Sequence, residues 1–167
     1  MRLLISLFLL SLLSACASYS GSNLKPGQAN LDDVLHVMGQ PAMRWQDTDG
    51  SQQLAYPRGP FGTQTFMVHV GADDVLQNIE NVLTWETLAR IRPGMTKEQV
   101  LRMLGPPEPS WTIYFERRDE LAWEWRYCDQ WTEAARIDVL LDASRGVVRS
   151  TYSRVESCGR SACTCGH

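Results

Sequence analysis

The sequence is short of the features that would point to a nucleic-acid partner or a membrane span. Its formal net charge is −3 and it holds no cluster of basic residues. This argues against nucleic acid, because binding phosphates requires basic groups. The apolar run from Leu3 to Leu13 is 11 residues long, whereas a helix needs about 20 residues to cross the hydrocarbon core.

Signals of catalysis are also missing. The chain has no glycine-rich phosphate loop, and neither His36 nor His69 accompanies a serine or cysteine in a recognisable motif. Several carboxylates fit the first turns of helices or the exposed sides of strands, where they complement the helix dipole or keep the surface soluble: Asp32, Asp33, Glu98 and Asp138. We therefore predict that the protein is not an enzyme and uses no cofactor.

The N-terminus has the pattern of a lipoprotein signal peptide. Arg2 precedes the short apolar run, which leads into Leu13-Ser14-Ala15-Cys16. Small residues before a cysteine suit a signal peptidase, and the free thiol can take a lipid. We predict cleavage before Cys16 and lipidation of Cys16, which is the predicted contact with the outer-membrane lipid bilayer, since several acyl chains anchor a protein stably.

The residue after the lipidated cysteine is Ala17 rather than Asp, which favours sorting to the outer membrane, facing the periplasm. Removal of residues 1–15 leaves enough chain for one ordinary domain or two small ones. Residues 16–23 are small and polar, and we predict that they form a flexible lipidated tether.

One pattern occurs twice, with an offset near 67 residues. The first copy contains Leu24-Lys25-Pro26-Gly27, Val34-Leu35, Gly39-Gln40-Pro41, Trp45 and Leu54-Ala55-Tyr56. The second contains Ile91-Arg92-Pro93-Gly94, Val100-Leu101, Gly105-Pro106-Pro107, Trp111 and Leu121-Ala122-Trp123. The repeat predicts two related units.

Each copy should begin with a short capped helix. Asn30 is a plausible N-cap before Leu31, Val34, Leu35 and Met38, which share one helical face. Thr96 and Gln99 form a capping box before the second helix. Both helices should end at a glycine, Gly39 or Gly105, because a proline follows soon after.

Alternating strands should follow each helix. Apolar residues alternate with polar ones in residues 121–127, 137–141 and 66–70, and turns at 142–146 and 71–74 lead into further strands at 147–155 and 75–83. Residues 85–91 read as a short helix with Trp85, Leu88 and Ile91 on one side. The predicted fold class is α+β: two tandem units, each a short helix or helix pair followed by a roughly three-stranded antiparallel sheet with helices packed on one face.

The segment from Pro93 to Pro107, PGMTKEQVLRMLGPP, resembles the entry motif of the BamE/SmpA/OmlA family of small outer-membrane lipoproteins. The resemblance covers most of residues 85–155, and the first copy is a degenerate version. Family members usually have one such unit. Two in tandem resemble the double-unit arrangement of β-lactamase inhibitor proteins.

The resemblance implies a non-enzymatic accessory protein with protein partners in the β-barrel assembly machinery, acting in outer-membrane protein assembly or envelope integrity. It supplies no catalytic residues. The alternative is a periplasmic inhibitor or small-ligand-binding lipoprotein that uses the concave sheet surface. The predicted division of the chain is 1–15 signal peptide, 16–23 tether, 24–83 first unit, 84–156 second unit and 157–167 cysteine-rich tail.

Four cysteines remain besides Cys16: Cys128, Cys158, Cys163 and Cys165. In an oxidising compartment they suggest two disulfides, for which three connectivities exist. A bond from Cys128 to a tail cysteine is favoured, since Cys163 and Cys165 are too close together for an unstrained bridge. A zinc site of Cys158, Cys163, Cys165 and His167 is the sharper alternative, but the spacing matches no zinc pattern well.

The tryptophans fit two roles: packing in the hydrophobic core, or contact with a binding partner. Trp123 and Trp125 alternate along one strand, which favours a place between sheet and helix. Trp111 and Trp131 lie near predicted strand ends, where an exposed aromatic ring can anchor an interface. These two are the candidate interface residues.

Overall fold

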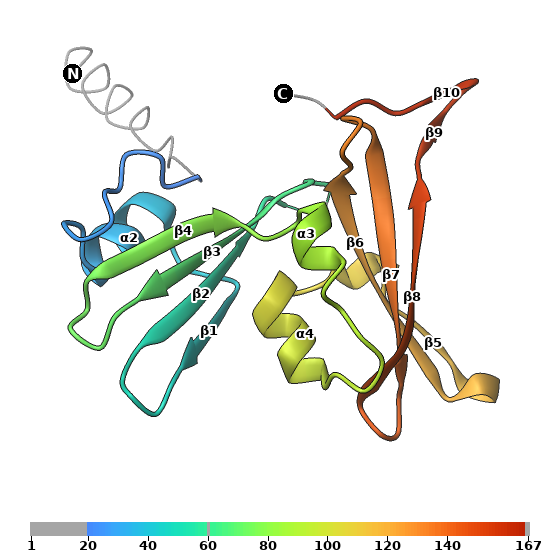
Figure 1. The fold of residues 1–167 in the computed structure, drawn as a ribbon, viewed down its shortest axis with the longest axis horizontal. Coiled ribbons are helices and arrows are strands. Elements are labelled where there is room, and N and C mark those ends of the chain that lie inside the picture. Colours follow the sequence, from blue (N-terminus) through green and yellow to red (C-terminus); the bar gives the residue numbers. More distant parts are fainter. Residues whose placement is uncertain (1–19, 60, 166–167) are drawn as a thin grey trace, which may run out of the picture.

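The computed structural model describes residues 20–59 and 61–165 (Figure 1). The helices are α2 (Leu31–Met38), α3 (Trp85–Leu88) and α4 (Lys97–Leu104), with short 3-10 helices η2 (Pro109–Trp111) and η3 (Glu116–Arg118). The strands are β1 (Met43–Gln46), β2 (Gln52–Pro57), β3 (Thr65–Val70), β4 (Leu76–Asn81), β5 (Ile113–Phe115), β6 (Glu120–Cys128), β7 (Ala134–Asp142), β8 (Val147–Val155), β9 (Ser157–Cys158) and β10 (Ser161–Ala162). The predicted signal peptide, Cys16 and His167 lie outside the described residues.

Besides the short two-stranded sheet of β9 and β10, two antiparallel sheets form the described fold, with strand orders β1-β2-β3-β4 and β5-β6-β7-β8. The α+β class is as predicted, but each of these sheets has four strands rather than about three. The additional strands, β1 and β5, have only four and three residues. They are too short to show a clear alternation in the sequence, and they form because each pairs with a longer neighbour.

Local signals determine the ends of α2 and α4. The Asn30 side chain accepts a hydrogen bond from the Asp33 N–H, and the Asp33 carboxylate accepts one from the Asn30 N–H, both at 2.9 Å. Thr96 and Gln99 form the same reciprocal pair, which confirms the predicted capping box. Both helices end at glycines of positive φ, Gly39 and Gly105, a conformation that costs glycine little.

The first sheet packs α2 against one face. Val34 and Met38 of the helix lie in a buried cluster with Leu54, Tyr56, Val68, Val70 and Leu76. Because strand side chains alternate, Ala55 and Met67 point to the opposite face, where they form a separate small cluster with Val82.

The second sheet packs against α3 and α4. Its inner face contributes Trp125, Tyr127, Ile137, Val139, Leu141 and Val148 to one buried cluster with Leu88, Val100 and Leu104. The Trp125 ring is 3% exposed, and its indole N–H donates to the Pro106 carbonyl at 3.0 Å. Trp123 meets Trp125 edge to face, with ring centroids 6.1 Å apart. Both rings are therefore part of the packing between sheet and helices.

Helix α4 lies between the two sheets (Figure 1). On the side of the first sheet, the Gln53 side chain donates to the Arg102 carbonyl at 2.6 Å, and the Arg102 guanidinium pairs with Asp47 at 2.8 Å. Arg102 also stands 5.7 Å from the Trp45 ring centroid. The helix thus joins the two sheets through contacts on both of its sides.

The two copies share the same attachment of loop to strand. The Gly27 N–H donates to the Leu76 carbonyl, and the Gly94 N–H donates to the Val148 carbonyl, each at 2.8 Å. The N-cap residues form matching isolated bridges, Asn30 with Val75 and Thr96 with Val147. The likeness seen in the sequence therefore extends to the hydrogen bonds that set each helix on its sheet.

Two expected features differ. The helix predicted over 85–91 ends at Leu88, and Trp85 is 55% exposed while Leu88 and Ile91 are buried. Trp85 stands in the first turn, where the short helix turns it away from the core. Of the expected flexible tether, residues 20–23 are described: Gly21 is buried, and its carbonyl accepts from the Leu24 N–H at 2.9 Å.

Candidate functional site

The outer face of the second sheet, turned away from α4, is polar where the inner face is apolar. Alternation along β6 places Glu124 and Arg126 on this face, and their partners across β7 and β8 are Asp138, Arg136 and Arg154. Glu124 is only 6% exposed. A buried carboxylate needs cationic partners, and the adjacent strands supply them.

These side chains form a continuous ion-pair network. The Glu124 carboxylate contacts Arg136 at 2.5 Å and also Arg154. Arg154 reaches Asp138 as well. Glu156 completes the network by accepting from Arg136 at 2.5 Å and from Arg126 at 2.8 Å. The network stiffens the outer face, because each charged group is held by at least one opposite charge.

A groove of about 320 Å³ crosses this face. Its floor contains Ala122 and Leu140 with the carboxylates of Glu124 and Asp138. The apolar side chains of its rim come from η2, β5 and β8: Trp111, Ile113, Phe115 and Tyr152. Two partly exposed arginines, Arg118 and Arg154, line it with them. Ile113 and Tyr152 are 51% and 59% exposed. Exposed aromatic and aliphatic side chains gathered on one face are a mark of a protein-binding surface.

Trp111 connects this groove with a second hollow. Its ring stacks on the Arg136 guanidinium, whose central carbon is 3.9 Å from the ring centroid. On its other side the Phe61 ring is 5.9 Å away. Trp111 also lines a cleft of about 340 Å³ with Pro57, Pro106, Pro107 and Pro109. Trp111 is half-buried and lines both hollows, and its role as an interface residue stays a prediction.

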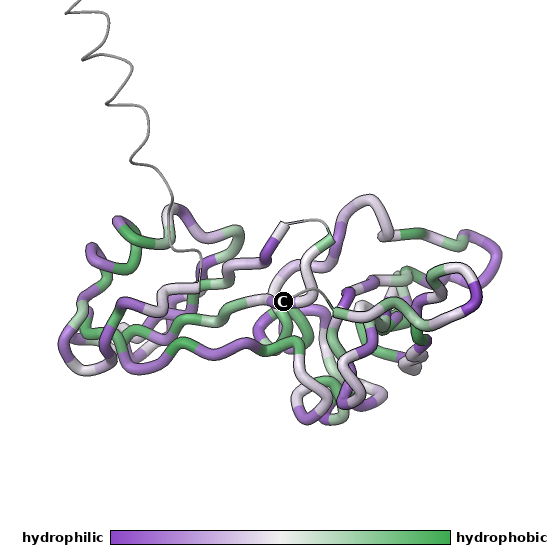
Figure 2. Tube along the Cα trace, turned by 90° about the horizontal axis from the view of Figure 1, so that it is seen from above, coloured by the Kyte–Doolittle hydropathy of each residue, from purple (hydrophilic) through white to green (hydrophobic). Residues whose placement is uncertain are grey.

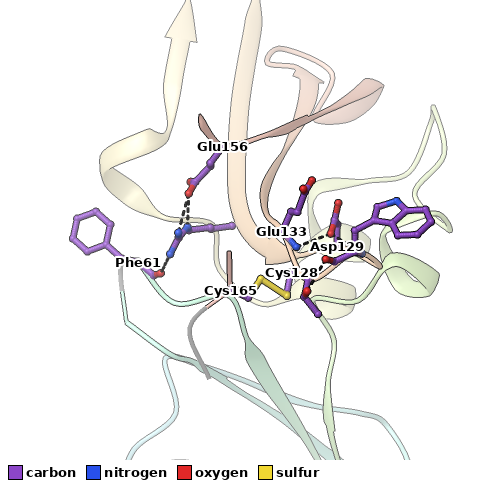
Figure 3. The surroundings of a disulfide bond; sticks show 9 residues. Phe61, Cys128, Asp129, Glu133, Glu156 and Cys165 are labelled. Carbon is purple, nitrogen blue, oxygen red and sulfur yellow. Dashed lines mark hydrogen bonds and ion pairs between the residues drawn. A yellow bond between two sulfur atoms is a disulfide. The ribbon is translucent and has the colours of Figure 1, made fainter. Parts of the chain in front are cut away.

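Trp131 lies elsewhere, at the turn between β6 and β7, and is 73% exposed. The Asp129 carboxylate holds this turn by accepting from the backbone N–H groups of Trp131 and Glu133 at 2.8 and 2.9 Å (Figure 3). The structure therefore does not bring the two candidate interface tryptophans into one site.

Disulfide bonds attach the tail beside this turn. Cys128 is bonded to Cys165 at this turn (Figure 3). A second bond, between Cys158 and Cys163, lies within the tail. The Cys165 N–H also donates to the Thr132 carbonyl at 2.9 Å. Near the Cys128–Cys165 disulfide, the Arg126 guanidinium forms an ion pair with Glu156 and donates a hydrogen bond to the Phe61 carbonyl at 2.7 Å. An open hollow of about 850 Å³ beside it is bordered by Phe61, Trp85 and Cys165.

The sequence did not show the outer groove. Asp138 was expected on an exposed strand exterior, but its side chain is 17% exposed and lies in the ion-pair network. Ile113, Phe115 and Tyr152 were not singled out, and neither were Glu124, Arg136 and Arg154. In the sequence, the only hint of this face was that the second set of alternating residues in 121–127 includes charged side chains. Their ion-pair partners belong to other strands, which lie next to β6 only once the sheet has formed.

The other residues considered lie apart from the groove. His36 is exposed on α2, and the His69 imidazole lies 3.5 Å from the Glu80 carboxylate on the first sheet. Asp32, Asp33 and Glu98 occupy helix first turns. Within residues 20–59 and 61–165 no group of histidines, cysteines and carboxylates is arranged to hold a metal ion. None of the helices in the described part of the chain is long and apolar enough to span a membrane.

Two carboxyl groups of the network have opposite pKa shifts. Burial and the neighbouring Glu124 raise the pKa of Asp138 to about 6, against the effect of Arg154. Burial opposes ionisation of Glu124 too, but hydrogen bonds from Arg136 and Arg154 lower its pKa. The pKa of Asp138 is therefore the higher of the two.

We expect Asp138→Asn to stabilise the protein at pH 8 and to leave its stability unchanged at pH 4. An unfolded aspartate titrates near pH 3.9, so between about pH 4 and pH 6 the folded state binds more protons and stability falls as the pH rises. The neutral amide removes this cost, which the difference between the two pKa values places at up to about 3 kcal/mol above pH 6. Urea unfolding at the two pH values measures it.

Asp142→Asn is the matched control, because hydrogen bonds from the Arg145 N–H and from Arg149 lower the pKa of Asp142. Its stabilising effect is present above the unfolded pKa and disappears as the pH falls, so this variant should lose stability at pH 8. A loss of stability for Asp138→Asn at pH 8 would contradict the assignment, since it would mean that the ion pair with Arg154 outweighs burial.

Comparison with protein families gives one match. Residues 80–135 match the family described as the outer membrane protein assembly factor BamE domain. The match contains α3, α4, β5 and β6, and thus the rim residues Trp111, Ile113 and Phe115. It confirms the resemblance to the BamE/SmpA/OmlA family for this part of the chain. Comparisons with curated proteins and with solved structures give no match.

Proposed function

We propose that this protein, which carries a BamE domain, is a lipid-anchored accessory protein on the periplasmic side of the outer membrane that binds partners in β-barrel protein assembly. The domain match is the observation that carries the proposal, because it relates residues 80–135 to outer membrane protein assembly factors. The lipoprotein cleavage motif Leu13-Ser14-Ala15-Cys16 supports the membrane attachment.

The outer groove of the second sheet is the surface that we assign to the partner. The apolar side chains of its rim can bury aromatic or aliphatic anchors, while the ion-pair network keeps the floor rigid and polar. The first unit, residues 24–83, would then support the second unit, residues 84–156, because α4 is braced by both sheets.

The proposal is tested by recovering the tagged, full-length protein from membranes with a mild detergent and identifying the proteins bound to it. We expect wild type to recover components of the β-barrel assembly machinery. Ile113→Glu places a charge on the groove rim and should reduce this recovery by about tenfold, the effect of losing one anchor of ~1.4 kcal/mol. Asn78→Glu, on an exposed position of β4, is the matched control and should recover as much as wild type.

Cys16→Ala tests the anchor separately. This variant should leave the membrane fraction, because the lipid is the only predicted attachment. Recovery of no assembly components by wild type, or equal recovery by Ile113→Glu, would contradict the proposal. A soluble periplasmic enzyme in their place would favour the inhibitor alternative, whose predicted surface across both units is interrupted by α4.

A further inference from the structure

We propose that the outer edge of β8, residues 149–155, is a docking strand that pairs with an extended segment of a partner protein. The inference rests on the proposed function only in taking the partner to be a protein. It goes further by naming the backbone of one strand as the contact and an extended polypeptide as what that backbone recognises.

The edge is long and open. β8 is the last strand of its sheet and pairs only with β7. The loop before α4 covers its first residues, where the Gly94 N–H donates to the Val148 carbonyl and the Val148 N–H donates to the Met95 carbonyl. Beyond this cover, seven consecutive residues, 149–155, are exposed.

The backbone groups that face outward can be assigned from the ladder. The Glu156 N–H donates to the Ala134 carbonyl of β7. Hydrogen-bonded positions alternate in an antiparallel pair, so Arg154 and Tyr152 also point their N–H groups toward β7. Thr151, Ser153 and Val155 therefore point theirs away from the sheet, and no partner for them lies among the described residues. This is a row of donors and acceptors spaced for another strand.

Several of the usual protections of an edge are missing here. Natural sheets blunt exposed edges with proline, charged side chains, β-bulges, short strands or a covering segment. β8 is nine residues long, contains no proline and is uncovered beyond Val148, so its protections are two arginines and the bulge at Leu140–Leu141 of the ladder. The corresponding strand β4 has a free edge of only five residues, 77–81. That strand belongs to the first sheet, whereas β8 belongs to the second sheet, toward the opposite end of the long axis (Figures 1 and 2).

The chain's own tail does not occupy the edge. After β8 the tail forms the short β9–β10 pair and returns to the turn between β6 and β7, where Thr164 bridges to Glu133 and Cys165 is bonded to Cys128. The Ala134 N–H donates to the Cys163 carbonyl at 2.6 Å. These contacts hold the nearest segment that could fold back on β8 at the end of the sheet instead.

Charge favours a foreign segment over a second copy. The charged residues of the edge are Arg149 and Arg154, both positive. Each is paired with carboxylates of its own sheet, and a second β8 would still add like charges alongside. An extended segment with apolar or acidic side chains on the outer face would lie beside Tyr152 and Arg154, which line the groove. Main-chain hydrogen bonds would then provide affinity, and the groove would provide specificity.

The test uses the full-length lipidated protein, isolated from membranes with its bound proteins. Hydrogen exchange of the backbone amides of Thr151, Ser153 and Val155 is compared between this assembly and the protein stripped of partners. We expect exchange to slow by at least about tenfold in the assembly, as for amides that gain a stable ladder bond.

Two substitutions of Thr151 separate the contribution of its backbone N–H from that of its side chain. Thr151→Pro removes an outward N–H and leaves the ladder with β7 in place, since proline is tolerated where the N–H faces out of the sheet. It should lower partner recovery by about tenfold. Thr151→Val keeps the N–H and should recover partners like wild type. Circular dichroism and thermal unfolding establish that both variants fold.

The outcomes distinguish this inference from the proposed function. Recovery of assembly components with unchanged exchange at the edge, or equal recovery by Thr151→Pro, overturns the docking strand and leaves the proposed function standing. Protection of the edge by a protein unrelated to β-barrel assembly supports the docking strand and overturns the proposed function. Protection in an assembly that contains only this chain shows a β8–β8 dimer and overturns the choice of partner, and recovery of nothing overturns both.

Discussion

Gly105→Ala is expected to lower the free energy of unfolding by about 3 kcal/mol or more. Gly105 ends α4 at φ +75° and ψ −171°, a region that residues with a Cβ occupy only at a cost of about 1–3 kcal/mol. An added Cβ would also lie 2.9 Å from Thr65 Cγ2 and 3.3 Å from Ala55 Cβ. Thr65 is 1% exposed and cannot easily move, so overpacking adds about 1–3 kcal/mol.

The repeat provides the matched control. Gly39 ends α2 with nearly the same backbone angles, φ +79° and ψ −161°, but an added Cβ there meets nothing within 4 Å. Gly39→Ala should thus show the backbone strain alone. Urea unfolding of both variants gives the difference, which measures the packing of α4 against the first sheet. Equal losses would show that this contact contributes nothing to stability.

The disulfide between Cys128 and Cys165 is expected to stabilise the protein more than the one between Cys158 and Cys163. The first links residues 37 apart and the second residues 5 apart. In the chain-entropy account a longer loop restricts the unfolded chain more, which predicts a loss of about 4 kcal/mol for Cys128→Ser with Cys165→Ser, against about 2 kcal/mol for the shorter pair.

Urea unfolding of the two double variants, with and without a reducing agent, measures this difference. Reduction should bring the parent protein down to or below the less stable variant. A parent protein whose unfolding does not change with reductant would show that the bonds do not form in solution. Equal losses would show that loop length does not govern their effect.

Release of the tail by Cys165→Ser also frees a segment that could cover β8, so partner recovery should fall in this variant.

The parts of the fold that were predicted correctly depend on neighbours close in sequence. The capping box of Thr96 and Gln99 and the terminating glycines Gly39 and Gly105 act within one or two helical turns, so their residue types suffice to place them. The long strands β6 and β7 were recognised because large apolar residues alternate along them. β8 was recognised because it follows the turn at 142–146 as a hairpin partner.

The candidate site was predicted less well. Trp111 was chosen as a strand-end aromatic and does stand at the groove, but its companions Ile113 and Tyr152 belong to strands at opposite edges of the sheet. Trp131 is exposed at a distant turn. No spacing in the sequence relates these residues, because their meeting depends on strand order and on the curvature of the sheet.

From the sequence alone came the repeat, the capped helices, the α+β class and the BamE resemblance, together with the prediction of a lipoprotein signal, since each depends on residues near one another or on a motif matched as a string. Only the tertiary structure decided the place of α4 between two sheets, the pairing of four cysteines, the ion-pair network around Glu124 and the open edge of β8. These depend on which distant segments lie side by side, and that is determined by packing the whole chain rather than by any local pattern.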